Sequence, residues 1–161
     1  MNYCSVCGEK LIQKQCGIDG NVPYCPKCKQ FRFPMFNSAI SAIVFNPTKD
    51  KILLIQQYGK KDNILIAGYI NKGENAKQTL VREIKEEIQL NVIDYTYNDN
   101  EYFEATNTLI HNYAVVVDSE DFVLTNEVDK AKWFKVEDVL SAIKPNSLAK
   151  SFVERYLVKN I

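Results

Sequence analysis

The amino-acid sequence predicts an α/β fold, a mixed sheet sandwiched between helices, preceded by a small cysteine-rich module. Strand-like apolar runs stand before and after one amphipathic helical segment, and two more helical segments close the chain. All five cysteines precede Lys29, in a stretch with few aliphatic side chains that needs a staple because it cannot bury a core. We therefore expect two domains, residues 1–34 and residues 35–161.

Each element of the larger domain follows from a local pattern. Apolar runs predict strands over 39–45, 51–58, 64–66, 109–117 and 131–134. Helical spacing predicts helices over 76–88, 136–143 and 147–158, the last two separated by Pro145-Asn146 and the last one capped by Ser147. In the first helix, Leu80, Ile84 and Ile88 stand four residues apart and form the buried stripe. The polar run 46–50 is expected to be a turn, and the run 98–104 a loop.

Composition and charge exclude several classes of protein. The chain has 161 residues, 46% of them hydrophobic, and its 20 basic residues balance its 20 acidic ones. A neutral chain has no global field to attract nucleic acid or anionic membrane, so such partners would need a local patch. No apolar run reaches the length of a membrane span, and the N-terminus lacks the pattern of a signal peptide. We therefore expect a cytoplasmic protein without a membrane partner.

The cysteine spacing predicts a structural zinc site. Cys4 and Cys7 form one Cys-x-x-Cys pair, and Cys25 and Cys28 form a second pair after seventeen intervening residues. Two such pairs supply four thiolates, the tetrahedral set that zinc prefers. A redox role is the alternative, but a redox motif does not come doubled at this spacing. Cys16 lies outside both pairs and is interpreted as an incidental loop cysteine rather than a reactive thiol.

The charge of this module argues against binding of nucleic acid. Basic residues outnumber acidic ones by three in residues 1–35, but a zinc ion with four thiolates carries a double negative charge. The remaining charge of about +1 gives weak attraction for a phosphate backbone. The zinc module is therefore expected to support the main domain or an oligomer contact.

Three glutamates mark the 76–88 helix as a candidate metal site. At about 100° per residue, Glu83, Glu86 and Glu87 form one stripe at the edge of the buried face. Clustered carboxylates raise one another's pKa unless a cation lies among them, and hard oxygen ligands suit Mg²⁺ or Mn²⁺. The alternative is a solvated acidic face. Arg82 is expected on the opposite side of the stripe, where it can hold Glu74.

The full spacing favours the metal site. It reads Gly68-x5-Glu74-x7-Arg82-Glu83-Ile84-x-Glu86-Glu87-x2-Leu90, and at these eight positions it resembles the box of the Nudix hydrolase family. The one departure is Gln89, where the family has a glycine that ends the helix in a left-handed conformation. We expect a less sharp helix end here, or Asn91 in the place of that glycine.

The resemblance implies a fold, a chemistry and a set of ligands. The family fold is an α/β/α sandwich, and its reaction is attack of water on a phosphorus of a nucleoside diphosphate linked to another group. It implies that Glu83, Glu86 and Glu87 bind Mg²⁺ or Mn²⁺, and that Glu86 or Glu87 also serves as the base. The main-chain carbonyl of Ala67 and the distant Glu127 are the implied additional ligands.

A zinc ribbon directly before the Nudix domain is similar to the branch typified by NADH pyrophosphatase. This likeness implies an NADH- or NAD-type dinucleotide as the first substrate to consider, and a homodimer. It also implies that Tyr69 and Phe33 stack on a base of the substrate, and that Ala149 belongs to a helix that closes the pocket. For both aromatic residues, plain core or interface packing is an equally good interpretation.

Departures from the branch leave the substrate open. The segment 100–108 replaces the branch's Ser-Gln-Pro-Trp signature, and Met35 stands where an arginine is usual. ADP-ribose, another dinucleotide, a nucleotide sugar or a nucleotide-capped RNA end therefore remain alternative substrates. The capped RNA end is the only nucleic acid expected as a partner. A Nudix fold that binds a nucleotide or RNA without catalysis is the competing class, and the complete glutamate set argues against it.

Overall fold

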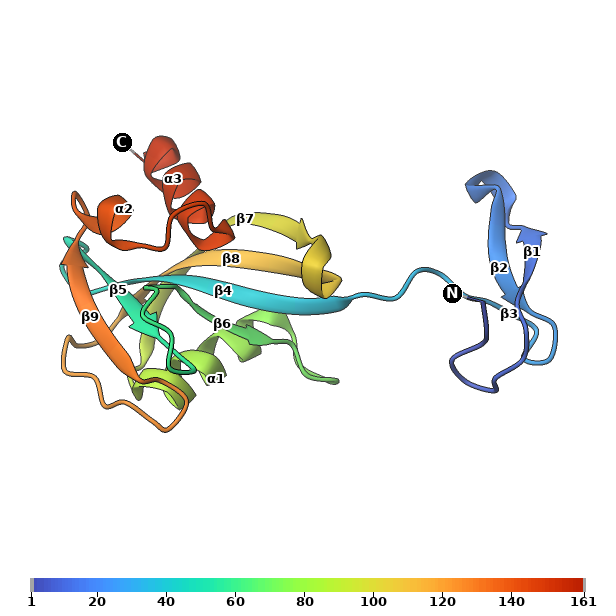
Figure 1. Cartoon of the computed structure of the whole chain (residues 1–161), viewed down its shortest axis with the longest axis horizontal. Helices are drawn as coiled ribbons and strands as arrows, with labels where there is room; N and C mark the ends of the chain where they lie inside the picture. The colour runs from blue at the N-terminus through green and yellow to red at the C-terminus, as the bar shows by residue number, and fades with distance from the viewer. Residues whose placement is uncertain (1, 161) are drawn as a thin grey trace. The chain divides into compact units, whose positions relative to one another are not determined.

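The computed structural model describes residues 2–160, which form two compact units. The first unit ends at Phe36 and the second begins at Asn37 (Figure 1). Among the described residues, no helix combines the length and the apolar character that crossing a bilayer requires.

The first unit is held together by short strands and by its cysteine turns. Within residues 2–36, an antiparallel sheet has the order β1-β2-β3, and a 3-10 helix, Gly17–Asp19, joins its first two strands. The strands are β1 Ile12–Gln15, β2 Asn21–Cys25 and β3 Gln30–Phe31. Tyr24 and Phe31 pack edge to face with ring centroids 5.1 Å apart. Only a few side chains of this unit are buried, so the cysteines carry much of its cohesion.

The second unit is built on a mixed sheet. Within residues 37–160 the six strands follow the order β7-β8-β4-β5-β9, with β6 paired to β4 beside that path. The pairing of β4 with β8 is parallel and the other pairings are antiparallel. The strands are β4 Asn37–Phe45, β5 Lys51–Gln56, β6 Ile66–Tyr69, β7 Val92–Phe103, β8 Thr108–Val117 and β9 Lys130–Lys135.

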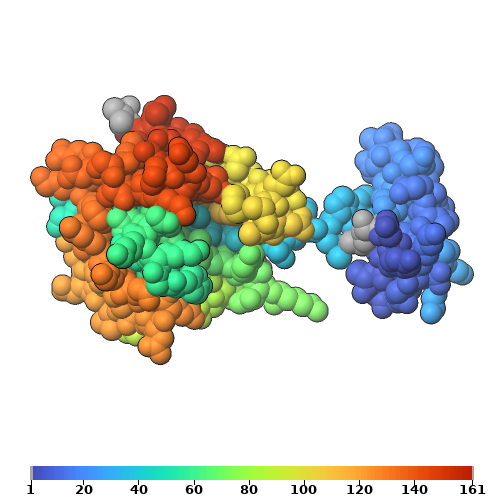
Figure 2. All heavy atoms as spheres, viewed as in Figure 1, coloured from blue at the N-terminus to red at the C-terminus, as the bar shows by residue number. Residues whose placement is uncertain are grey.

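Helices cover both faces of this sheet. One face carries α1 Ala76–Ile88, and the other carries α2 Val139–Ala142 and α3 Leu148–Asn160 (Figure 1). In the space-filling view, α2 and α3 form one continuous surface on their side of the unit (Figure 2). The predicted α/β/α sandwich with a mixed sheet is therefore confirmed.

Strand β4 shows how the sequence divides the core. Its side chains alternate between the two faces, because successive residues of a strand point to opposite sides. Ile40, Ala42 and Val44 join the cluster under α1, whereas Ile43 and Phe45 join the cluster under α3. From Ala39 onward this strand is buried on both sides, which explains an apolar run that only Ser41 interrupts.

The same strand changes its partner along its length. Ala39–Ala42 pairs with β6, while Val44 and Phe45 pair with β5. The sheet is therefore split on this side of β4, and β6 lies as a short separate strand against α1. This split positions the candidate site described below.

Helix α1 begins and ends by different means. The Asn75 side chain accepts a hydrogen bond from the Gln78 backbone, and the Gln78 side chain accepts one from Asn75 in return. At the other end Gln89 itself adopts the left-handed conformation, with φ 58° and ψ 18°. The expectation that the helix end is less sharp, or that Asn91 replaces the missing glycine, is therefore wrong.

Three predicted elements need correction. The run 98–104 is not a loop, because β7 continues to Phe103 and is followed by a 3-10 helix, Glu104–Thr106. Two register shifts in its pairing with β8 interrupt the alternation that would have marked a strand. The helix expected over 136–143 shrinks to α2, and the strand expected over 64–66 lies instead at β6, with Ile64 forming an isolated bridge.

Candidate active site and zinc site

A cavity of about 430 Å³ opens where β6 leaves the main path of the sheet. Its walls come from β6, α1, the start of β8 and the loops after β5 and β8. The residues that line it are Ala39, Tyr58, Ala67, Gly68, Tyr69, Asn71, Arg82, Glu83, Glu87, Thr106, Thr108, Ile110 and Glu127. The folded chain thus gathers segments far apart in sequence around two glutamates of α1.

These two glutamates are buried. Glu83 is 7% exposed and Glu87 is 2% exposed, although both are charged in water at neutral pH. Strand β6 passes close above Glu83, and a Cβ atom at Gly68 would overlap the carboxyl group of Glu83. Glycine at this position therefore lets the strand approach the helix while the carboxylate stays in the cavity wall.

Burial changes the titration of both carboxyl groups. It raises the pKa of Glu87 to about 8, and the negative charges of Glu83, Glu127 and Glu86 act in the same direction. A hydrogen bond from Gln57 Nε2 to Glu87 Oε1, 3.0 Å long, partly opposes this rise. Burial also raises the pKa of Glu83, against the lowering effect of Arg82.

The donor set fits a divalent cation. Among the described residues, Glu87 Oε2 is buried and has no hydrogen-bond partner. A buried carboxylate oxygen without a partner is costly unless a cation or a proton satisfies it. Hard oxygen ligands of this kind suit Mg²⁺ or Mn²⁺, and Glu83, Glu87 and Glu127 line the same cavity.

Arg82 joins the carboxylates to the start of the helix. Its Nε and one terminal nitrogen donate to Glu74 over 2.8 and 2.9 Å. Its other terminal nitrogen donates to Glu83 over 2.6 Å and to Glu86 over 2.9 Å. The hydrogen bonds from Arg82 lower the pKa of Glu74 to about 2. The predicted hold on Glu74 is present, but Arg82 lies among the glutamates and not opposite them.

The outer glutamates differ in their placement. The Glu86 side chain is 51% exposed and is not among the residues that line the cavity. Glu127 reaches the cavity because its loop is fastened to the end of α1. In that loop Val123 N–H donates to the carbonyl of Ile88 over 3.1 Å, and Thr125 N–H donates to that of Glu87 over 3.4 Å. These bonds satisfy carbonyls at the helix end, which lack partners within the helix.

Two of the residues expected to bind substrate, Tyr69 and Ala149, line different cavities of the second unit. Tyr69 lines the main cavity, and its side chain is 54% exposed. Ala149 lines a separate cavity of about 180 Å³, which shares Ala67 and Ile110 with the main one. Phe33 belongs to the first unit and is 55% exposed.

Several residues around the cavity carried no signal in the sequence. Gln57 follows directly after β5 and bonds Glu87, while Tyr58 beside it has a positive φ of 58°. Thr106 ends the 3-10 helix before β8 and Thr108 begins β8, and their hydroxyl groups are 2.9 Å apart. A lone glutamine or threonine belongs to no spacing pattern. Only the folded structure shows that these residues lie near the glutamates of the cavity.

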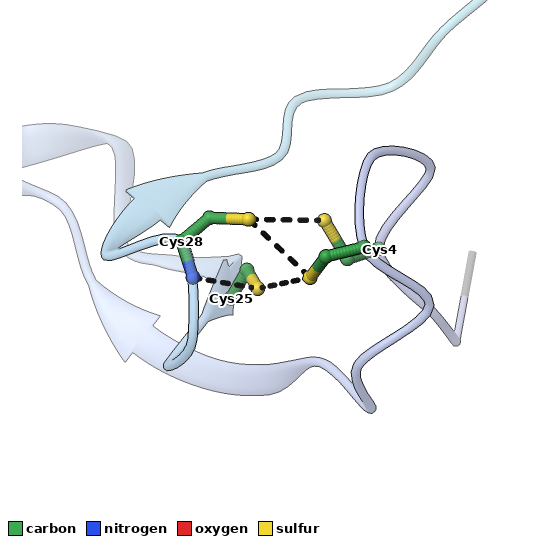
Figure 3. A group of neighbouring side chains, drawn as sticks. Cys4, Cys25 and Cys28 are labelled. Atoms are coloured by element: carbon green, nitrogen blue, oxygen red, sulfur yellow. Dashed lines mark hydrogen bonds between the residues drawn. The ribbon is translucent and has the colours of Figure 1, made fainter.

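The cysteines form a second candidate site, in the first unit. The Sγ atoms of Cys4, Cys7, Cys25 and Cys28 all lie within 4.8 Å of one another. Three of their separations are 3.3, 3.5 and 3.9 Å (Figure 3). Four thiolates around a zinc ion at 2.3 Å would stand about 3.8 Å apart, so this group could bind zinc.

Arg32 contributes to the same site. Its Nε donates to Cys4 Sγ over 3.2 Å. Burial raises the pKa of the Cys4 thiol, but the bond from Arg32 and nearby backbone N–H groups outweigh burial and lower this pKa to about 6. A lowered pKa favours the thiolate, which is the form that binds metal. Cys16 is not part of this group.

Known proteins resemble the chain over most of its length. A family model described as the NUDIX domain matches residues 35–156. The NAD-capped RNA hydrolase NudC of Pseudomonas aeruginosa is 24% identical over 160 residues, and that of Pseudomonas putida is 25% identical over 162 residues. These alignments cover 98% and 99% of this chain but 56% and 57% of the relatives. The chain thus spans little more than half the length of these curated relatives.

Solved structures share the fold. A NUDIX hydrolase from Nitrosomonas europaea superposes with a TM-score of 0.71 at 18% identity, covering 99% of this chain and 92% of that one. The NUDIX domain of Shewanella oneidensis NrtR, complexed with ADP ribose, has a TM-score of 0.60 at 18% identity and covers 86% of this chain and 94% of its own. At such identities the likeness concerns the fold alone.

Proposed function

Because this chain belongs to the NUDIX domain family, we propose that it is a divalent-metal-dependent nucleotide pyrophosphohydrolase. The observation that carries this proposal is the pair of buried glutamates, Glu83 and Glu87, in the wall of one cavity. Two buried like charges with an unpartnered oxygen are unfavourable without a cation, and a cation at that place is what phosphoanhydride hydrolysis needs.

The proposed ligands follow from the family resemblance and the cavity. Glu83, Glu87 and Glu127 line it, and so does Ala67 of β6, whose carbonyl is the further proposed ligand. Glu86 is linked to Glu83 through Arg82, which donates a hydrogen bond to each of them. When bound, Mg²⁺ or Mn²⁺ would neutralise the diphosphate and lower the pKa of the attacking water.

The protein side chains have separate tasks in this proposal. Glu87, which lines the cavity, is the first choice for the base that accepts a proton from water, and the more exposed Glu86 is the alternative. Arg82 holds Glu83 and Glu86 in place through its two hydrogen bonds. Tyr69 at the cavity wall offers an aromatic face on which a base of the substrate would stack.

An NADH- or NAD-type dinucleotide is the proposed substrate class. Support comes from the NudC relatives of Pseudomonas aeruginosa and Pseudomonas putida, which are named as hydrolases of NAD-capped RNA. The NrtR domain in complex with ADP ribose makes ADP-ribose the first alternative. The two ligands share an adenosine diphosphate, so the same cavity could bind either one.

The remaining parts of the proposal concern the whole protein. A structural zinc in the cysteine group, a homodimer and a cytoplasmic location complete it, the last because the cysteines are arranged for metal and not for disulfides. Phe33 and Ala149 are retained as proposed substrate contacts. Light scattering during gel filtration would test the dimer.

A substrate panel tests the activity. The protein would be incubated with Mg²⁺ and with NADH, NAD⁺, ADP-ribose, diadenosine polyphosphates, nucleotide sugars and NAD-capped RNA, with Glu87→Gln as the control. Release of a nucleoside monophosphate from NADH by wild type alone is the expected result. Turnover of a different panel member would replace the substrate, and binding without turnover of any of them would contradict the proposed activity.

A further inference from the structure

Glu87 is held from one side by a side chain that no motif includes. The amide Nε2 of Gln57 donates to Glu87 Oε1 over 3.0 Å, and Glu87 is 2% exposed. Its other oxygen, Oε2, has no hydrogen-bond partner among the described residues. The two oxygens of one carboxylate therefore have different environments, one fixed by protein and one left for another ligand.

Gln57 is itself fixed by the turn that follows β5. Lys60 N–H donates to the Gln57 carbonyl over 3.1 Å, and this turn contains Tyr58 and Gly59, both with positive φ. Gly59 N–H donates to Asp129 Oδ2 over 2.7 Å, which ties the turn to the start of β9. The amide of Gln57 is thus delivered to Glu87 by backbone that is held at several points.

The neighbouring glutamine shows that this arrangement is local. Gln56 points to the other side of the strand, as alternate residues do. Its Nε2 donates to the carbonyl of Lys61 over 3.0 Å and to Asn63 Oδ1 over 2.9 Å. Gln56 therefore offers the same amide, one residue away, without contact to the glutamates of the cavity.

We propose that Gln57 is a positioning residue for the divalent cation, because it fixes Glu87 so that Oε2 remains available as the ligand. This inference rests on the proposed function. A neutral amide suits the task because it orients the carboxylate without neutralising it, whereas a lysine or arginine at this place would compete with the cation for the charge. Side chains that orient metal ligands in this way usually account for a 10- to 100-fold difference in metal affinity, an order-of-magnitude range.

The test measures Mn²⁺ affinity without any substrate. Manganese binding to the zinc-loaded protein would be followed by electron paramagnetic resonance for wild type, Gln57→Met and Gln56→Met. Methionine keeps the length of glutamine but lacks the amide. The expected result is a Kd for Gln57→Met about 10- to 100-fold above that of wild type, with Gln56→Met unchanged.

A second variant covers the case in which Gln57→Met does not fold. Gln57→Asn keeps the amide but is one methylene shorter, so it too should lose the contact to Glu87 and weaken Mn²⁺ binding. Thermal unfolding recorded for each variant separates lost affinity from lost structure. Equal Mn²⁺ affinity in wild type and in a folded Gln57 variant would overturn the inference, as would equal weakening by Gln56→Met.

The outcomes distinguish this inference from the proposed function. Hydrolysis by wild type together with an unchanged Mn²⁺ affinity of the Gln57 variants would overturn the role of Gln57 alone. Mn²⁺ binding that depends on Gln57, without hydrolysis of any panel nucleotide, would contradict the proposed function alone. A wild-type protein that binds no Mn²⁺ would overturn both.

Discussion

Gly68 of β6 stands directly against the carboxyl group of Glu83 on α1. A Cβ atom at position 68 would overlap the carboxyl carbon and both oxygens of Glu83. Because Glu83 is buried and also accepts a bond from Arg82, it has little room to move aside. The close approach of strand and helix thus depends on the absence of a side chain at one residue.

Replacement of Gly68 by alanine should displace Glu83 from the cavity. A shift of about 1 Å in a catalytic group can lower turnover on the order of 100-fold. We therefore expect Gly68→Ala to reduce kcat by roughly this factor on the best panel substrate, measured in steady state with saturating Mg²⁺. Wild-type turnover in a folded Gly68→Ala protein would show that the position of Glu83 does not matter.

The ion pair of Arg82 with Glu74 predicts acid sensitivity. The pKa of Glu74 falls from 4.5 to about 2 in the folded protein, chiefly through its hydrogen bonds with Arg82. A carboxyl group with a lowered pKa stabilises the fold above pH 4.5, and this stabilisation is lost as pH falls towards 2. Wild type should therefore melt above Glu74→Gln at neutral pH, and the two melting temperatures should converge in this acidic window. A constant difference down to pH 2 would contradict the assignment.

Glu87 predicts the opposite pH dependence. Its folded pKa of about 8 exceeds the ordinary value of 4.5, so the metal-free folded state binds more protons than the unfolded state between these values. Stability should fall as pH rises through this window, with a slope of at most about 1.4 kcal/mol per pH unit from this group. Glu87→Gln removes the titration, so its stability relative to wild type should increase with pH.

Trp133 reports on the unfolding of the second unit, so its fluorescence allows the stabilities of wild type and Glu87→Gln to be compared. It is the single tryptophan of the chain, lies in β9, and donates its ring N–H to the Glu120 carbonyl over 2.9 Å. Denaturant unfolding followed by its fluorescence at several pH values, without added divalent cations, would give the free energies. Parallel pH profiles for wild type and Glu87→Gln would contradict the raised pKa.

The cysteine group predicts one bound zinc per chain. Cys25→Ser should remove one of the four thiolates and abolish stoichiometric zinc, because an incomplete set binds far less tightly. Cys16→Ser is the matched control, since Cys16 lies outside the group and its loss should leave zinc in place. Metal analysis of the purified variants measures this directly, and zinc retained by Cys25→Ser would argue against the site.

Regular patterns made much of the fold predictable from the sequence. The bounds of α1 are those expected, 76–88, because its apolar spacing and its polar cap agree. Strand β4 was found because it is buried on both faces from Ala39 onward and its sequence is therefore apolar there except at Ser41. Strand β7 was not predicted at all. Its pairing with β8 is interrupted by bulges and many of its side chains are polar, so it lacks the regular apolar alternation of a strand.

The candidate site was predictable only where its residues follow a spacing. Glu83 and Glu87 are four residues apart on one helix, so their nearness follows from helical geometry. The contacts of Arg82 with Glu83 and Glu86 depend on the conformation of the long Arg82 side chain. The angular positions of residues around the helix do not predict that conformation. Gln57 follows β5 and bonds Glu87, whereas Thr108 begins β8 and lines the cavity, and only the assembled sheet shows that both lie near the glutamates.

The most direct test of the central claim is hydrolysis with and without a divalent cation. The nucleotide panel would be followed by chromatography for wild type and Glu87→Gln, each with Mg²⁺ and without it. Wild type should release a nucleoside monophosphate from a dinucleotide only when Mg²⁺ is present, and Glu87→Gln should do so at a small fraction of that rate. Equal product in the absence of the cation, or equal rates in the two proteins, would contradict the claim.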